Sequence, residues 1–314
     1  MYPAYITAFL LYNYGMSFTF SIFACFMNKK LISWGIFVLL CFIWGSSFIL
    51  MKVIREGLTA PQTAALRIFS ASIVFVPFAF SHFFKIPSSK RLLSCVTGAF
   101  GNLIPAFCFA YGIMKIDSSL AGILNSLTPI CVVVIGVLFF KDHIVWKKIA
   151  GVLIGFAGLC LLTYNHATLT INNIEYALLI IAGTVSYGLN INIVSHRLKE
   201  VNPIHLSTVS LSAMCLPALF MLWQQDFFEL DFTDSTIRWA VINAVVLGLS
   251  ASTIGTFLFY SLVKREGGLF ASLVTYGVPF VALFWGVLAG ELITAIEIGC
   301  LLVILGGVYL ANRK

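Results

Sequence analysis

The chain has 314 residues, of which 60% are hydrophobic and only 10% carry a charge, and its mean hydropathy is +1.01. Soluble domains carry roughly 25% charged residues, and a soluble fold of this length has too little interior to bury so much apolar surface. The composition therefore excludes an ordinary soluble domain and indicates a membrane protein. The net charge of +7 does not predict nucleic-acid binding, because most of the basic residues lie in or beside the turns between apolar runs.

Motifs that carry enzyme or metal chemistry are missing from the sequence. The eight cysteines lie in apolar runs without a C-x-x-C pair, and we expect them to be small buried hydrophobes. The five histidines lie at the ends of apolar runs or in loops, and there is no H-E-x-x-H, G-x-S-x-G or phosphate-loop pattern. The sequence therefore predicts no enzyme, no cofactor and no metal site.

Ten apolar segments are long enough to cross a hydrocarbon core of about 30 Å as helices. They lie at 31–53, 61–82, 91–114, 117–140, 145–163, 174–196, 203–223, 236–263, 268–290 and 293–311. We treat residues 1–30 as an N-terminal extension that either adds one more span or is not native. Residues 4–26 lack the basic flank and cleavage site of a signal peptide. If Met27 is the natural start, deletion of residues 1–26 is expected to leave the folded protein intact.

Basic residues are distributed unequally between the two sides of this arrangement. One side holds Lys29, Lys30, Lys85, Lys90, Arg91, Lys141, Lys147, Lys148, Arg197, Lys199, Lys264, Arg265, Arg313 and Lys314. The other side holds Lys52, Arg55, Lys115 and Arg238. Since cytoplasmic loops are enriched in Lys and Arg, we expect the first side and the C-terminus to be cytoplasmic in a multi-pass protein of the inner (plasma) membrane. The acidic loop at 224–235 then faces outward.

The second half of the chain repeats the first with an offset of 150 positions. Ser118–Phe140 and Gly268–Gly290 are both apolar, and the offset aligns Pro129 with Pro279. Five spans in a half is an odd number, so the second half enters the membrane from the opposite side. We therefore predict an all-α membrane protein of two inverted five-helix repeats. The repeats are 31–164 and 174–314.

Several motifs resemble EamA-type transporters of the drug/metabolite transporter (DMT) superfamily. They are W-G-S-S-F at 44–48, Pro61 followed by Leu66-Arg67, N-S-L-T-P at 125–129, and Asp142 with Gly151 nine residues later. The resemblance covers 31–314. It implies a secondary transporter that exports small metabolites such as amino acids by alternating access, with a small-molecule substrate and the lipid bilayer as its partners.

Other functions stay open beside this one. A sugar-phosphate or nucleotide-sugar exchanger is the second transport hypothesis, although it calls for basic residues facing the cavity. A different class is a non-transporting membrane subunit or a lipid scramblase. No Asp or Glu lies at mid-span, so the sequence predicts no proton relay built on a buried carboxylate.

Prolines predict where the binding site lies. Pro105, Pro129 and Pro279 lack an N–H, so each frees the carbonyl four residues earlier and is expected to break its span. Freed carbonyls near polar side chains at the midplane are typical of transporter sites. The predicted substrate-binding residues are Trp44, Asn102, Asn125, Ser126, Tyr187, Asn190, Thr256, Tyr260, Thr275 and Tyr276. The alternative is that the prolines only bend the helices and neighbouring groups satisfy the carbonyls.

Two further polar features lie inside spans. Ser252, Thr256 and Tyr260 recur every four residues and share one face of span eight, either lining a path or joining helices. Arg67 lies roughly 9 Å into span two, counted from Pro61. It meets either an anionic group of the substrate or a structural partner, and its place near a helix end favours the structural role.

Overall fold

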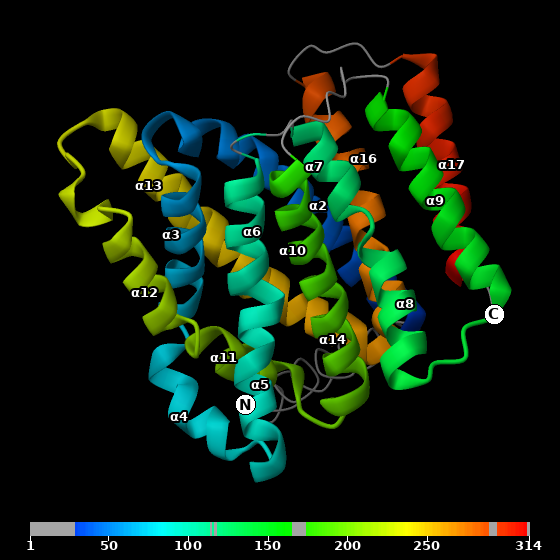
Figure 1. Cartoon of the computed structure of the whole chain (residues 1–314), viewed down its shortest axis with the longest axis horizontal. Coiled ribbons are helices and arrows are strands. Elements are labelled where there is room, and N and C mark those ends of the chain that lie inside the picture. Colours follow the sequence, from blue (N-terminus) through cyan, green and yellow to red (C-terminus); the bar gives the residue numbers. More distant parts are fainter. Residues whose placement is uncertain (1–28, 114, 116–117, 165–173, 289–293, 313–314) are drawn as a thin grey trace, which may run out of the picture.

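A computed structural model describes residues 29–113, 115, 118–164, 174–288 and 294–312. Every regular element in these ranges is a helix (Figure 1). The first half of the chain contains α2 (Lys29–Gly57), α3 (Ala60–Ile73), α4 (Val76–Phe84), α5 (Ser88–Gly98), η1 (Ala99–Leu103), α6 (Ile104–Gly112), α7 (Ser118–Asn125), α8 (Thr128–Phe140) and α9 (Trp146–Tyr164). The second half contains α10 (Ile174–Asn192), η2 (Ile193–Arg197), α11 (Pro203–Ser212), α12 (Cys215–Gln224), η3 (Phe227–Glu229), α13 (Ser235–Leu247), η4 (Gly248–Ile254), α14 (Gly255–Glu266), α15 (Gly268–Ser272), α16 (Val274–Leu288) and α17 (Ala295–Asn312).

The predicted all-helical membrane class is confirmed, and each predicted span has a helical counterpart. Among the described residues, eight helical segments are long and apolar enough to cross a membrane, or nine if the bent pair α3 and α4 forms one span. The nineteen-residue α9 is not among them. The possible extra span before Met27 lies outside the described residues.

Helix ends follow their local sequence. A capping box starts α3, because the Thr59 side chain accepts from the Gln62 N–H while the Gln62 side chain accepts from the Thr59 N–H. The same helix is followed by a bend of 60° into α4, which has Pro77 in its first turn. On the other half, the Asn202 side chain caps α11 by accepting from the N–H of Ile204.

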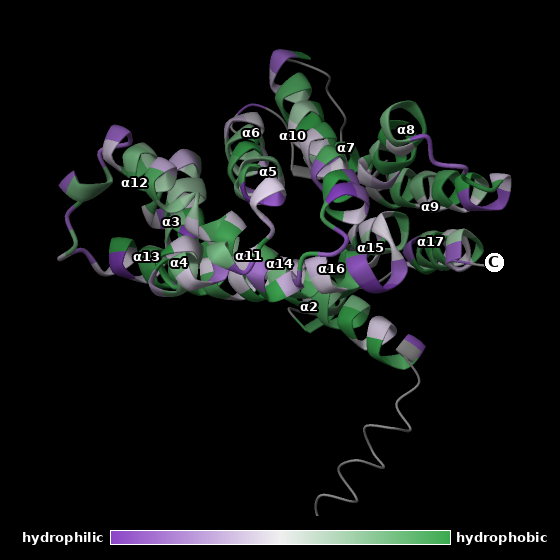
Figure 2. Ribbon diagram, turned by 90° about the horizontal axis from the view of Figure 1, so that it is seen from below, coloured by the Kyte–Doolittle hydropathy of each residue, from purple (hydrophilic) through white to green (hydrophobic). Residues whose placement is uncertain are grey.

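The first helix of each half packs inside the other half. In the first half, α2 packs against α13, α14 and α16, and α3 packs against α12 and η4. In the second half, α10 packs against α6, α7 and α8, and α11 packs against α4 and α5. Figure 2 views many of these helices nearly end-on, with hydrophilic segments mainly at helix ends and connecting turns. The interface between the halves is therefore extensive and lies in the interior.

Close backbone contact joins α9 to α17, which run side by side in Figures 1 and 2. A Cβ atom on Gly151 would lie 2.3 Å from the backbone nitrogen of Ala311, and one on Gly307 would lie 2.3 Å from that of Gly155. Any side chain at these positions would separate the helices. Small residues of this kind allow membrane helices to pack without a hydrophobic driving force.

Candidate functional site

Two spans contain a π-helical segment at matching positions. The segment η1 (Ala99–Leu103) lies between α5 and α6, and η4 (Gly248–Ile254) lies between α13 and α14. The offset of 150 positions that relates the two halves places η1 on η4. The predicted break at Pro105 is instead a π-helical stretch in which the N–H of Ile104 bonds to the carbonyl of Ala99. Such stretches are rare and are frequently found at functional sites.

The segment η1 contacts the second half through polar groups. The side-chain oxygen Oδ1 of Asn102 accepts a hydrogen bond of 3.1 Å from the hydroxyl of Thr256, and both side chains are buried. The carbonyl of Phe100 accepts one of 2.9 Å from Ser186. A Cβ atom on Gly101 would lie only 2.4 Å from Nδ2 of Asn190. Glycine at this position therefore lets the Asn190 amide lie directly on the η1 backbone.

The segment η4 contacts the first half in the same way. Its Ser252 hydroxyl accepts a hydrogen bond of 2.8 Å from Nε of Arg67 in α3. The Ala251 carbonyl accepts one of 3.1 Å from the indole of Trp44, whose ring packs 5.4 Å from that of Phe259. The segments η1 and η4 thus each join their own half of the chain to the other half.

Two buried polar atoms in this region have no hydrogen-bond partner among the described residues. They are Oδ1 of Asn190 and the hydroxyl of Tyr260. The Tyr260 hydroxyl lies beside the side chains of Asn190, Thr97 and Ser210, although none meets full hydrogen-bond geometry. Buried polar atoms in native proteins almost always have partners, so these two atoms make the region a candidate binding site.

We call Arg67, Asn102, Asn190, Ser252, Thr256 and Tyr260 the polar row. Tyr260 lies eight positions after Ser252, or about 12 Å further along the helix axis. The row combines side chains from both halves at mid-span, on the predicted face of span eight. The sequence predicted four of its six members as site residues. It placed Ser252 only in the polar stripe of span eight, and it favoured a structural role for Arg67.

At the break in span four, by contrast, the polar groups bond locally. The helix α7 ends at Asn125 and α8 begins at Thr128. Pro129 has no N–H to donate to the Asn125 carbonyl. This carbonyl instead accepts a hydrogen bond of 2.6 Å from the Thr128 hydroxyl. The Ser126 hydroxyl donates to the carbonyl of Ile123. The Asn125 carbonyl is therefore not free, although the side-chain oxygen of Asn125 is buried without a partner.

The break in span nine lies elsewhere than predicted. The helix ends at Ser272 and resumes at Val274, whereas Pro279 is inside α16. The Thr275 hydroxyl donates to the Ser272 carbonyl at 2.9 Å. The Tyr276 hydroxyl donates to the carbonyl of Val152 in α9, and this side chain is fully buried. Tyr276 therefore lies in the packing against α9 rather than in the polar row.

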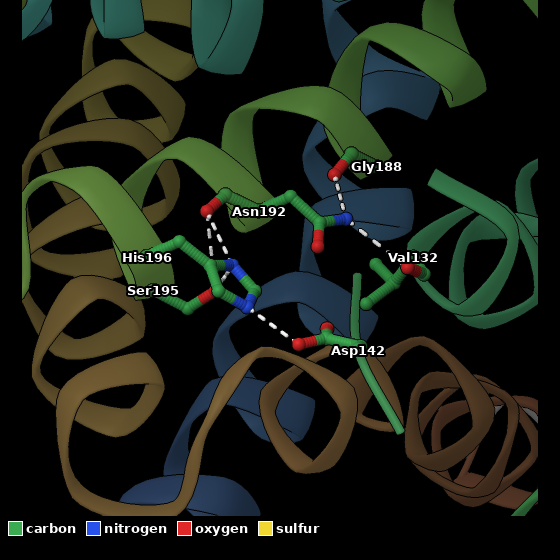
Figure 3. A network of polar contacts seen from close by, with 6 residues as sticks. All are labelled: Val132, Asp142, Gly188, Asn192, Ser195 and His196. Carbon is green, nitrogen blue, oxygen red and sulfur yellow. Dashed lines mark hydrogen bonds and ion pairs between the residues drawn. The ribbon is translucent and has the colours of Figure 1, made fainter. Parts of the chain in front are cut away.

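Further contacts join the halves at the end of the molecule that carries most basic turns. Lys90 pairs with Glu200 at 2.5 Å, and this pairing lowers the pKa of the exposed Glu200 carboxyl. Figure 3 shows a second contact, in which the Asp142 carboxylate lies 2.8 Å from Nε2 of His196. The ring of His196 is held by the backbone carbonyl of Asn192, whose own side chain donates to two other carbonyls. In the part of the chain described, no group of three His, Cys, Asp or Glu side chains could hold a metal.

Comparisons with known proteins agree with this architecture. A crystal structure of a protein 17% identical to this chain superposes with a TM-score of 0.70, covering 90% of this chain and 96% of the other. An uncharacterized transporter of Archaeoglobus fulgidus is 24% identical over 90% of this chain and 99% of its own length. Protein PagO of Salmonella typhimurium is 22% identical over 79% of this chain and 81% of its own.

One further relative is named for its substrate. The S-adenosylmethionine uptake transporter of Rickettsia felis is 22% identical over 67% of this chain and 68% of its own length. The model of the EamA-like transporter family matches the chain twice, at residues 32–164 and 175–313. The chain belongs to the EamA-like transporter family.

Proposed function

We propose that this transporter exports a small polar metabolite such as an amino acid by alternating access, with the polar row as its binding site. The observation that carries the proposal is the pair of contacts at the π-helical segments, Asn102 with Thr256 and Arg67 with Ser252. Each contact joins one half of the chain to the other. A molecule bound there touches both halves, so movement of one half against the other exposes it to either side of the membrane.

We infer that the two halves are inverted five-helix repeats, an arrangement that is typical of this mechanism. The reciprocal packing of α2 and α10 into the opposite halves is expected of two copies related by an axis in the membrane plane. The matching positions of η1 and η4 favour the same relation. Segments at corresponding depths of two inverted copies are expected to enclose a site near the midplane, which supports the proposed position of the polar row.

The roles proposed for the predicted residues differ. Asn102, Asn190, Thr256 and Tyr260 contact the substrate, with the unpartnered oxygens of Asn190 and Tyr260 as acceptors. Trp44 and Tyr187 form the walls beside them. Four more predicted residues belong to the breaks or to helix packing, where they govern the movement of the helices. These are Asn125, Ser126, Thr275 and Tyr276.

The proposed orientation places the basic turns and the C-terminus in the cytoplasm. Outward transport then starts at the end where Lys90 pairs with Glu200 and Asp142 with His196. The relative named for S-adenosylmethionine uptake supports a metabolite substrate, and its direction is the opposite of the one proposed here. Reporter tags at Lys314 and at 226–234 are expected to report the cytoplasm and the outside, respectively.

Flux into liposomes tests the proposal. The purified protein is first screened by thermal shift against a metabolite panel, since a ligand stabilises the state that binds it. Uptake of the stabilising compounds is then measured for the wild type, Asn102→Ala and Thr256→Ala, with Ser81→Ala as the control. We expect both polar-row variants to lose most of the flux. Normal flux in both variants, or no substrate-dependent flux in the wild type, would contradict the proposal.

A further inference from the structure

Arg67 is a charged residue in an otherwise buried part of α3. Its neighbours Leu66 and Ile68 are 5% and 1% exposed, whereas Arg67 itself keeps accessible surface. It lies seven residues beyond the start of the helix at Ala60, which corresponds to about 10 Å. A charge at such a position in a membrane protein requires a partner or a water-filled cavity, and it marks a functional site by default.

No carboxylate in the described part of the chain forms an ion pair with Arg67. The helices packed against α3 include α2, α4, α6, α11, α12, α13 and η4, and the one acidic residue in them is Glu56, which is exposed in the last turn of α2. Among the described residues, the one hydrogen bond of its side chain runs from Nε to the hydroxyl of Ser252. Guanidinium has five N–H donors, so four remain. The phenol of Tyr187 in α10, in the other half of the chain, lies in the neighbourhood of Arg67.

Two other arginines in this chain show what a structural role looks like. Arg91 donates to the backbone carbonyls of Ile86 and Phe84 and covers the ring of Phe84 at 4.9 Å. Arg238 donates to two backbone carbonyls in the loop before α13. Arg91 fastens its turn through Nε and one terminal nitrogen, and Arg238 does so through one terminal nitrogen. Arg67 fastens no turn, because its terminal nitrogens donate no hydrogen bond to the described residues.

We propose that Arg67 binds the carboxylate of the transported substrate, beside the hydroxyl of Ser252. This inference rests on the proposed function and names the substrate class, namely metabolites with a single free carboxylate, including zwitterionic amino acids. The two terminal nitrogens of guanidinium match the two oxygens of a carboxylate. A phosphate carries up to two negative charges at neutral pH, and the polar row contains only one cationic side chain to meet them.

The rest of the substrate extends along the polar row. Thr256 is one turn from Ser252, about 6 Å along the axis, and Tyr260 is one turn further. The free oxygens of Asn190 and Tyr260 accept hydrogen bonds from an ammonium or hydroxyl group. An anion-binding end and an acceptor end on one row fit an amino acid better than a cationic amine or an apolar compound.

The test compares amino acids with their carboxamides, which keep the side chain and the amino group but lose the negative charge. Thermal shift and equilibrium binding are measured on the full-length purified protein for L-amino acids, the matching L-amino amides, chloride and inorganic phosphate. We expect at least one carboxylate to bind at least tenfold more tightly than its amide. Equal binding of acid and amide, or equal stabilisation by chloride or phosphate, would overturn the inference.

Substitutions assign the preference to this residue. In Arg67→Gln the affinity for the carboxylate should fall at least tenfold while that for the amide changes less than twofold, and Arg67→Lys should keep part of the preference. Arg91→Gln is the control, because it removes the same charge from a structural turn. Unchanged discrimination in Arg67→Gln would contradict the inference, and should that variant not fold, the acid–amide comparison in Arg67→Lys takes its place. If the wild type transports a compound without a carboxylate, the proposed transport function stands and only the carboxylate site is contradicted.

Discussion

The break in span four and the π-helical segment in span three interrupt neighbouring helices in different ways. At the break, the hydroxyls of Ser126 and Thr128 donate to carbonyls three residues earlier in the same span. At η1, the side chain of Asn102 and the carbonyl of Phe100 accept hydrogen bonds from the other half of the chain. Lost backbone hydrogen bonds are compensated locally in the first case. In the second, the altered helix presents polar groups to a different part of the molecule.

This difference separates helix bending from ligand binding. A proline followed or preceded by Ser and Thr can satisfy its freed carbonyl without help, which makes the break a hinge. A π-helical segment keeps the span continuous and redirects its side chains, so polar groups from two halves can converge. We therefore expect substitutions at the π-helical segments to affect binding, and substitutions at the break to affect movement.

The largest effect is expected from filling the contact beside η1. A Cβ atom on Gly98 would lie 1.9 Å from the backbone oxygen of Ser210, whereas one on Gly122, before the break, meets nothing within 4 Å. Gly98→Val should therefore force α5 and α11 apart and destabilise the protein by about 1–3 kcal/mol or more. The melting temperature and the folded yield in the membrane measure this. Gly122→Val is the matched control. An equal decrease in melting temperature in both variants would contradict the tight contact at Gly98.

A double-mutant cycle tests the hydrogen bond across the halves. Asn102→Ala and Thr256→Ala should couple by about 0.5–1.5 kcal/mol, because each removes the side-chain partner of the other. Unfolding free energies of the two single variants and the double variant give this value. Ser126→Ala combined with Asn102→Ala should be additive, since the Ser126 hydroxyl donates to a backbone carbonyl within its own span. Additivity of Asn102 and Thr256 would show that their contact contributes no stability.

Much of this arrangement could be predicted from the sequence, and the reasons for the misses are physical. The lengths of the apolar runs predicted the helices. The predicted stripe of Ser252, Thr256 and Tyr260 lies on a face of span eight that contacts the other half. The π-helical segments were not predicted, because a change from i→i−4 to i→i−5 backbone hydrogen bonds has no signature in the composition. The role of Arg67 could not be decided from the sequence, because its partners depend on which helices pack around it.

Removal of the proline at the break should affect movement more than stability. In Pro129→Ala the restored N–H competes with the Thr128 hydroxyl for the Asn125 carbonyl, which favours a straight helix across residues 126–127. We expect flux to fall several-fold while the melting temperature changes by only a few degrees and substrate affinity stays within about twofold. A large loss of affinity with normal turnover would assign Pro129 to the binding site and remove the distinction between break and π-helix.

The smallest effect is expected for the solvent-exposed ion pair between the halves, Lys90 with Glu200. Lys90 lowers the pKa of Glu200 below its ordinary value of 4.5 through a hydrogen bond and its charge. Because the folded state lowers this pKa, the contact stabilises the protein above about pH 4.5, and the contribution is lost as the pH falls through the folded-state pKa. Glu200→Gln should therefore lower the melting temperature slightly at pH 7 and not at pH 3, and salt should reduce the difference.

Glu200→Gln also separates two explanations of the polar row. Glu200 and Asn102 both contact the other half, but Glu200 is exposed and Asn102 is buried. If it mattered only that a contact joins the two halves, the two contacts would contribute similarly to stability. Burial predicts that the exposed pair contributes little, because water competes for both partners and the side chains lose freedom when they pair. The melting temperatures of Glu200→Gln and Asn102→Ala are therefore compared. An equal decrease in both variants would mean that contact between the halves matters more for stability than burial of the contact.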